Sequence, residues 1–116
     1  MQAWLQILGC VSDSAANGEE AVNKVNENDY DVVLMDIMMP VMDGLDATRA
    51  IRSNGYHTLP IIALTASVRE EDQEKTRTAG LNDFLAKPVD PDRLKEKLLE
   101  WAGAKLSRIA ATEEEP

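Results

Sequence analysis

The chain has 116 residues, which is enough for one domain with a core of its own. Its net charge of -9 argues against binding to nucleic acid or to an anionic membrane, because both need basic patches. No apolar run approaches the ~20 residues of a membrane helix, so we expect no membrane contact by this segment. Cys10 is the only cysteine, which excludes a disulfide framework within the chain and is consistent with a cytoplasmic location.

Short apolar runs alternate with amphipathic stretches along the chain, and this alternation predicts strands and helices in turn. In chain order we expect a strand over Cys10–Ala16, a helix over Glu19–Asn28, a strand over Val32–Asp36, a helix over Leu45–Ser53, a strand over Leu59–Ala66, a helix over Val68–Ala79, a strand over Asp83–Lys87 and a helix from about Pro91. An alternating order without internal repeats indicates an α/β fold with a doubly wound parallel sheet.

Three of the predicted strands end in polar side chains, namely Asp36, Thr65 and Lys87. For Asp36 alone, capping of the following loop is the alternative interpretation. Because the carboxyl ends of parallel strands meet at one edge of a sheet, however, we expect the three side chains to converge. A carboxylate can form an acyl phosphate, while a hydroxyl and an ammonium can hold the oxygens of the transferred group. The set therefore predicts phosphoryl transfer.

Three segments resemble the receiver domains of two-component response regulators, and more closely the receivers attached to hybrid histidine kinases. The segments are Asp36–Gly44, Pro60–Ala66 and Gly80–Pro88, and the resemblance runs from about Gly9 to Gly103. It implies a flavodoxin-like sheet of the receiver type. We expect the receiver domain over residues 1–106, followed by a C-terminal extension with a disordered acidic tail over residues 107–116.

The resemblance also implies roles for individual residues. Asp36 matches the phospho-acceptor, Thr65 the switch hydroxyl, Phe84 the switch aromatic residue and Lys87 the invariant lysine of the family. The cofactor of the family is Mg²⁺, for which Asp36 and the backbone carbonyl of Met38 match two ligands. The implied partner is a histidine kinase or a phosphotransfer domain.

One departure from the family concerns its first strand, which ends in two acidic residues that help to bind magnesium. Residues 1–9 of this chain align with the end of the family's first helix, and Asp13, the first acidic residue, lies in the second-strand segment. Magnesium prefers near-octahedral oxygen coordination, for which Asp36 and Met38 alone are a poor ligand set. We therefore expect an incomplete site, weak or absent Mg²⁺ binding and impaired phosphorylation.

The same departure predicts a defect in the sheet, because the missing strand is central in the family's strand order of 2-1-3-4-5. Such a strand buries roughly four or five apolar side chains at about 1.5–3 kcal/mol each, comparable with a domain's net stability of about 5–15 kcal/mol. Direct pairing of the flanking strands, association of two chains, or a rearrangement of residues 1–9 could repair the gap. We favour a homodimer, since an unpaired strand edge is a template for another chain.

Three functions remain open from the sequence. The first is a receiver that accepts a phosphoryl group from a kinase phosphohistidine onto Asp36, within a hybrid sensor kinase and without independent catalytic activity. The second is a degenerate receiver that acts as a protein-interaction module without phosphorylation. The third is an aspartyl-phosphate phosphohydrolase, which needs a second Asp two residues after the first; Met38 stands there, so this class is disfavoured.

Overall fold

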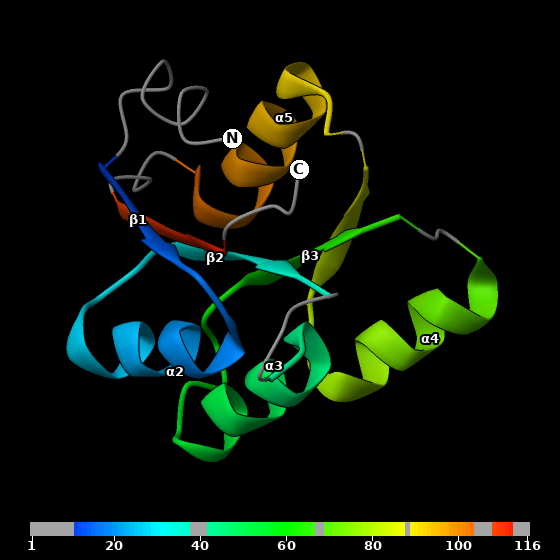
Figure 1. Ribbon diagram of the computed structural model, residues 1–116. Helices are drawn as coiled ribbons and strands as arrows, with labels where there is room; N and C mark the ends of the chain where they lie inside the picture. The colour runs from blue at the N-terminus through cyan, green and yellow to red at the C-terminus, as the bar shows by residue number, and fades with distance from the viewer. Residues whose placement is uncertain (1–10, 38–41, 67–68, 88, 104–107, 113–116) are drawn as a thin grey trace.

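The computed structural model describes residues 11–37, 42–66, 69–87, 89–103 and 108–112, which form an alternating series of strands and helices (Figure 1). The strands are β1 (Val11–Ala15), β2 (Val32–Asp36), β3 (Ile61–Thr65), β4 (Asp83–Ala86) and β5 (Arg108–Thr112). The helices are α2 (Gly18–Glu27), α3 (Gly44–Ser53), α4 (Glu70–Ala79) and α5 (Pro91–Ala102). Every strand and helix predicted above is present, with ends that differ by one or two residues.

Short polar side chains explain where α2 and α3 begin. The side chain of Asn17 accepts a hydrogen bond from the backbone N–H of Glu20 at 2.9 Å, and the side chain of Asp43 accepts one from Asp46 at 2.9 Å. Each bond satisfies an N–H group that has no partner within the first turn of its helix. At the C-terminal end of α4, Gly80 has a φ of 109°, a left-handed conformation that glycine adopts without steric cost.

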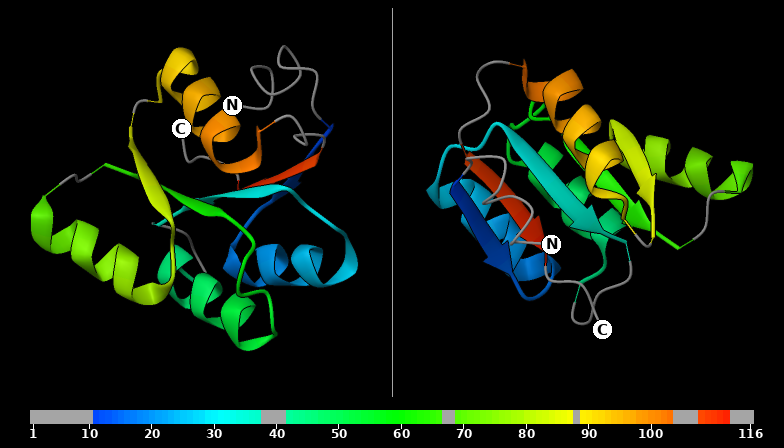
Figure 2. Two further views of the ribbon diagram at one scale, coloured as in Figure 1. Left: turned by 180° about the vertical axis from the view of Figure 1, so that it is seen from behind. Right: turned by 90° about the horizontal axis from the view of Figure 1, so that it is seen from above.

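All five strands are parallel and follow the order β1-β5-β2-β3-β4. Helix α5 covers one face of the sheet, and α2, α3 and α4 cover the other, so that the molecule has three layers (Figures 1 and 2). The predicted parallel α/β sheet with helices on both faces is therefore present. No helix in the described ranges combines the length and the apolar composition that crossing a membrane requires.

The prediction that the central strand of the sheet is missing is wrong. Strand β5 lies between β1 and β2, in the position that the family gives to its first strand, and its red arrow runs between the blue and cyan arrows in Figure 2. It pairs along its full length with β1, from Val11 beside Arg108 to Ala15 beside Thr112, and it also pairs with β2. The sheet thus has no gap for a second chain to fill, and the reason for expecting a homodimer disappears.

Strand β5 fits the central position because its side chains are small or apolar and alternate between the two layers. Ile109 and Ala111 belong to the apolar cluster under α5, whereas Ala110 belongs to the cluster under α2 and α3. All three are at most 3% exposed. Residues 108–112, which we had assigned to an extension beyond the domain, therefore form part of the sheet. The extent of the domain as a folding unit stays a prediction, and residues 113–116 lie outside the described part of the chain.

Candidate active site

The carboxyl ends of β2, β3 and β4 meet at one edge of the sheet. Asp36 is the last residue of β2, Thr65 is the last residue of β3, and Lys87 follows β4 directly. In the register of the sheet, Asp36 lies beside Leu64 and Thr65 lies beside Ala86. The backbone N–H of Lys87 also donates to the carbonyl of Thr65 at 2.8 Å. The structure thus brings the three residues to neighbouring positions along this edge.

Asp36 and Lys87 form an ion pair at this edge. The lysine Nζ donates to Oδ2 of the aspartate at 2.5 Å, and the side chains of Asp36 and Lys87 are 1% and 26% exposed. A carboxylate that is almost fully buried is costly without a compensating charge, and the ammonium supplies that charge. Because the lysine side chain is still partly exposed, the pair lies at the boundary between the core and solvent. Of the two partners, the lysine is the one that reaches solvent.

Two further residues that the sequence singled out, Phe84 and Met38, are not among the side chains that the structure describes at this edge. Phe84 is partly buried in β4 beside Ala63 of β3, and it packs against the apolar cluster between the sheet and α2, α3 and α4. It therefore lies two positions short of the strand end rather than at the Asp36 edge. Met38, the predicted source of a carbonyl ligand, lies outside the described residues.

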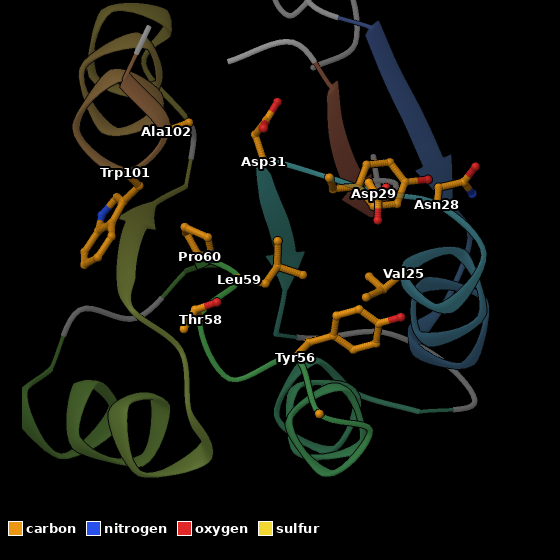
Figure 3. A pocket seen from close by; sticks show the side chains of 12 residues that line it. Val25, Asn28, Asp29, Asp31, Tyr56, Thr58, Leu59, Pro60, Trp101 and Ala102 are labelled. Atoms are coloured by element: carbon orange, nitrogen blue, oxygen red, sulfur yellow. The ribbon is translucent and has the colours of Figure 1, made fainter. Parts of the chain in front are cut away.

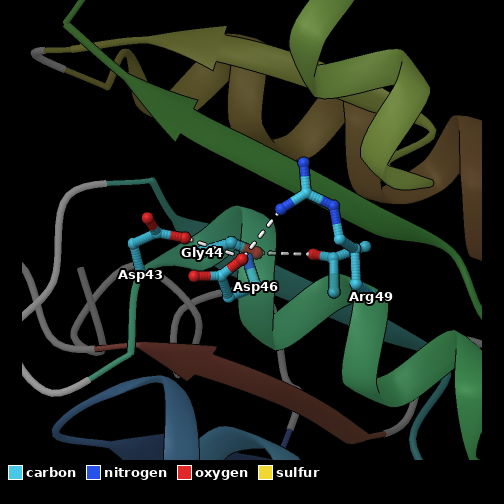
Figure 4. Close-up of polar contacts among 5 residues, drawn as sticks. Asp43, Gly44, Asp46 and Arg49 are labelled. Carbon is cyan, nitrogen blue, oxygen red and sulfur yellow. Dashed lines mark hydrogen bonds and ion pairs between the residues drawn. The ribbon is translucent and has the colours of Figure 1, made fainter.

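The start of α3 packs against the backbone of Asp36. The N–H of Gly44 donates to the carbonyl of Ile37 at 3.0 Å, and a Cβ added at Gly44 would lie 2.3 Å from the carbonyl oxygen of Asp36, so no side chain fits there. The helix is capped by Asp43, and Asp46 forms an exposed 2.8 Å ion pair with Arg49 within α3 (Figure 4). The close approach of Gly44 therefore packs the start of α3 directly against the backbone that carries the carboxylate.

Sequence reasoning missed one residue of the site, which is Thr112 at the end of β5. Its Oγ1 accepts a hydrogen bond from the backbone N–H of Asp36 at 2.7 Å, and the threonine is 2% exposed. The available signal was the run Ile109–Ala111, an apolar segment that ends in a hydroxyl residue, like the segment that ends at Thr65. The predicted C-terminal extension over residues 107–116 leaves this signal unused.

The described residues do not make a magnesium site by themselves. Among them, no group of three or more His, Cys, Asp or Glu side chains is arranged to hold a metal ion. Magnesium is usually held by one or two carboxylates together with phosphate oxygens and water. Glu113, Glu114 and Glu115 follow Thr112 in the sequence and lie outside the described residues.

A cavity of about 580 Å³ lies at the opposite end of the strands (Figure 3). Its lining includes Asp31 and Pro60, which directly precede β2 and β3, together with Tyr56 and Trp101. None of the predicted site residues lines it. The cavity is therefore separate from the polar edge at Asp36.

A second charged cluster links β4 to α5. Asp83 accepts from Nζ of Lys97 at 2.8 Å and from the indole N–H of Trp101 at 3.0 Å. Burial by itself raises the pKa of Asp83, but these bonds and the backbone N–H of Phe84 outweigh it and place that pKa below its ordinary value. The bond to Asp83 likewise raises the pKa of Lys97. The cluster fastens α5 to the sheet and lies apart from Asp36.

Comparisons with known proteins place this geometry in a family. The model of the response regulator receiver domain matches residues 1–99. Hybrid signal transduction histidine kinase L of Dictyostelium discoideum is 42% identical over 99 residues, which are 79% of this chain and 6% of that kinase. The chain spans 14% or less of the length of the first curated relatives that it matches.

Two solved structures have the same fold. The receiver domain of the sensor histidine kinase PA1611 from Pseudomonas aeruginosa PAO1, with a magnesium ion coordinated in its active site cleft, is 41% identical with a TM-score of 0.82, over 89% of this chain and 85% of that one. The second is the co-crystal structure of the Saccharomyces cerevisiae histidine phosphotransfer signaling protein Ypd1 with the receiver domain of its downstream response regulator Ssk1. Its sequence identity is 32% and its TM-score is 0.82, over 87% of this chain and 77% of that one.

The family model covers most of the chain, and the sheet presents a buried aspartate beside a lysine where parallel strands end. The chain belongs to the family of response regulator receiver domains, and its homologues include the receivers of hybrid histidine kinases.

Proposed function

We propose that this chain accepts a phosphoryl group from a phosphohistidine onto the carboxylate of Asp36, as the receiver of a hybrid sensor kinase or a related phosphorelay. The observation that carries the proposal is the ion pair between the buried Asp36 and Lys87 at the carboxyl edge of the sheet. A buried carboxylate at a strand end, paired with a lysine that is partly exposed, is the arrangement that an acceptor of a phosphoryl group needs.

The chemistry is a displacement at phosphorus. A carboxylate oxygen of Asp36 forms a bond to the phosphorus atom while the bond from phosphorus to the imidazole nitrogen breaks. The electron pair of the broken bond stays on that nitrogen, which takes up a proton from solvent. The products are an acyl phosphate on Asp36 and a neutral histidine. The ammonium of Lys87 stabilises the negative charge that gathers at the acceptor, since a fixed charge in a partly buried site acts without reorganisation.

Thr65 and Phe84 are the proposed switch residues. Thr65 lies at the carboxyl edge and Phe84 lies two positions before the end of the neighbouring strand. A hydroxyl that turns toward a new phosphoryl group leaves space behind it, and an aromatic ring on the adjacent strand can fill that space. Such a local rearrangement would report phosphorylation at Asp36 to the face formed by α4, β4 and α5.

The proposed partner is a protein that presents a phosphohistidine, such as a histidine kinase or a phosphotransfer protein. The support is a homologous receiver, that of Ssk1, which is found with Ypd1, a histidine phosphotransfer signaling protein. For the metal, the support is limited to one described carboxylate. We therefore propose that the described residues bind Mg²⁺ weakly, although a homologous receiver holds this ion in its active site cleft.

A degenerate receiver is the second candidate, and the lack of a metal-ligand cluster among the described residues favours it. In that case the chain would bind a partner without taking up phosphate. The two candidates differ in whether a covalent product forms at all.

The test is transfer from a phosphotransfer protein that carries a labelled phosphohistidine. We expect label on the wild-type chain and none on Asp36→Asn. The matched control is Asp46→Asn, which removes an exposed carboxylate ten positions further along the sequence and should leave transfer unchanged. Absence of label from the wild-type chain with several such donors, and equally with a small phosphodonor, contradicts phosphotransfer and supports the degenerate receiver.

A further inference from the structure

The end of the C-terminal strand contacts the backbone of the proposed acceptor directly. We propose that Thr112 is a positioning residue for Asp36, so that phosphoryl acceptance depends on a hydroxyl supplied by strand β5. The inference rests on the proposed function for its kinetic readout. It adds Thr112 to the residues on which phosphoryl acceptance depends, and this residue acts through the backbone of Asp36 without touching the phosphoryl group.

The hydroxyl of Thr112 connects two backbone groups of β2. Its Oγ1 accepts from the N–H of Asp36 at 2.7 Å and lies 3.5 Å from the carbonyl of Leu34, to which it donates. All three residues are buried, with exposures of 2% or less. Water therefore does not replace the hydroxyl when it is removed. A buried N–H that loses its partner costs about 1–3 kcal/mol, which makes the bond a strong constraint on the backbone at residue 36.

The bond stands where the regular pairing of the two strands ends. The register between β2 and β5 runs from Val32 beside Ile109 to Leu34 beside Ala111, and it stops before Asp36. On the other side of β2, Asp36 is still paired with Leu64 of β3. The side chain of Thr112 thus supports the backbone of Asp36 on the β5 side, where the backbone pairing between β2 and β5 has ended. Without it, the backbone N–H of Asp36 loses this hydrogen bond on the β5 side.

Support of this kind matters because the acceptor must meet phosphorus in line while staying beside the ammonium of Lys87. A misplacement of about 1 Å in a reacting group can lower a rate by about 10²-fold. Threonine is suited to the task because its hydroxyl can accept one hydrogen bond and donate another. Valine has the same shape without either function, and serine keeps both functions while losing a methyl group.

A consequence is that the reactive edge is assembled from distant parts of the chain. Asp36 and Thr112 are 76 residues apart in sequence. The backbone of the acceptor is therefore in its final arrangement only when β5 is in place between β1 and β2. Phosphoryl acceptance should then report on the docking of the C-terminal strand.

The experiment compares Thr112→Val and Thr112→Ser in the full chain, with Thr76→Val as a matched control. Thr76 is also a largely buried threonine, and its hydroxyl donates within α4 to the carbonyl of Asp72 at 2.9 Å, away from Asp36. The rate of phosphorylation by a small phosphodonor, such as phosphoramidate, is measured together with hydrogen exchange at the Asp36 amide. We expect Thr112→Val to lower the rate by between about tenfold and 10²-fold and to speed exchange at that amide. Thr112→Ser should stay close to wild type in both, and Thr76→Val should change neither.

Equal rates for wild type and a folded Thr112→Val chain would overturn the proposal. So would a Thr112→Ser chain that is as slow as Thr112→Val, because then the methyl group matters and not the hydroxyl. If Thr112→Val does not fold, a nuclear Overhauser contact between the Asp36 amide proton and the Thr112 side chain of the wild type decides instead, and its absence refutes the proposal. If the wild type takes up no phosphate, the proposed function fails, while amide exchange in the valine and serine variants still tests the role of Thr112.

Discussion

Replacing Ile109 by alanine tests whether β5 really completes the sheet. The isoleucine side chain is 0% exposed and belongs to the cluster under α5, between the sheet and the residues Leu94 and Leu98. Truncating a buried isoleucine to alanine costs about 2–5 kcal/mol, since the lost transfer free energy is joined by the cost of the cavity. That loss is a large part of the about 5–15 kcal/mol by which a small domain is stable.

The assay is urea unfolding followed by circular dichroism, with Leu99→Ala as the matched control. Leu99 lies on the outer side of α5 and is 48% exposed, so its truncation should change the free energy of unfolding by no more than about 0.5 kcal/mol. A chain that ends at Gly103 should be destabilised further than Ile109→Ala, because it loses the pairing with both β1 and β2. A chain that ends at Thr112 keeps the strand and should unfold near the wild-type midpoint.

Unchanged midpoints for both Ile109→Ala and the chain that ends at Gly103 would refute the reasoning. They would mean that the sheet is stable without a strand between β1 and β2. A midpoint that rises with protein concentration would instead point to a second chain in the central position.

Three further predictions concern the charged groups. Lys87→Met should slow phosphorylation of Asp36 by a small donor more than Lys87→Arg does, because only the arginine keeps a positive charge beside the carboxylate. Equal rates for both variants would show that the positive charge at position 87 does not contribute to the reaction. The hydrogen bonds to Asp83 lower its pKa below the ordinary 3.8, so the stability that they provide is present above that pH and is lost as the pH falls through the lowered value. Asp83→Asn should therefore lower stability at pH 7 and flatten its acid dependence, as measured by urea unfolding at several pH values, whereas a variant with the wild-type slope would contradict this. Magnesium titration of the wild-type chain should show weak binding. The variant in which Glu113, Glu114 and Glu115 are replaced by glutamine tests the basis of this expectation. Tight binding by the wild type that disappears in the variant would contradict it and would assign the ligands to those glutamates.

The sequence allowed the three polar strand ends to be predicted because its signals are local. An apolar run that ends in a polar residue marks the end of a buried parallel strand, and the carboxyl ends of such strands share one edge. Those two rules suffice to bring Asp36, Thr65 and Lys87 together. Helices α2, α3 and α5 were equally predictable, since each combines amphipathic periodicity with a polar cap, whereas the polar helix α4 is marked by Gly80 at its end.

The central strand could not be predicted in the same way. Ala110 and Ala111 have a low intrinsic preference for strands, and their segment follows the last amphipathic helix, where a tail is the ordinary expectation. What makes this segment a strand is burial between β1 and β2, which is a property of the assembled fold. The same error hid Thr112, because a hydroxyl at the end of a supposed tail has no apparent partner. The prediction of a missing central strand was wrong because β5, which follows the last predicted helix, supplies that strand.

The most direct test of the account is chemical trapping of the phosphorylated residue. Borohydride reduces an acyl phosphate on aspartate to homoserine, so a chain phosphorylated by a small donor can be reduced, digested and sequenced by mass spectrometry. We predict homoserine at position 36 and at no other aspartate. Homoserine at a different position, or none at all in a folded chain treated with donor and magnesium, would contradict the assignment of Asp36 as the acceptor.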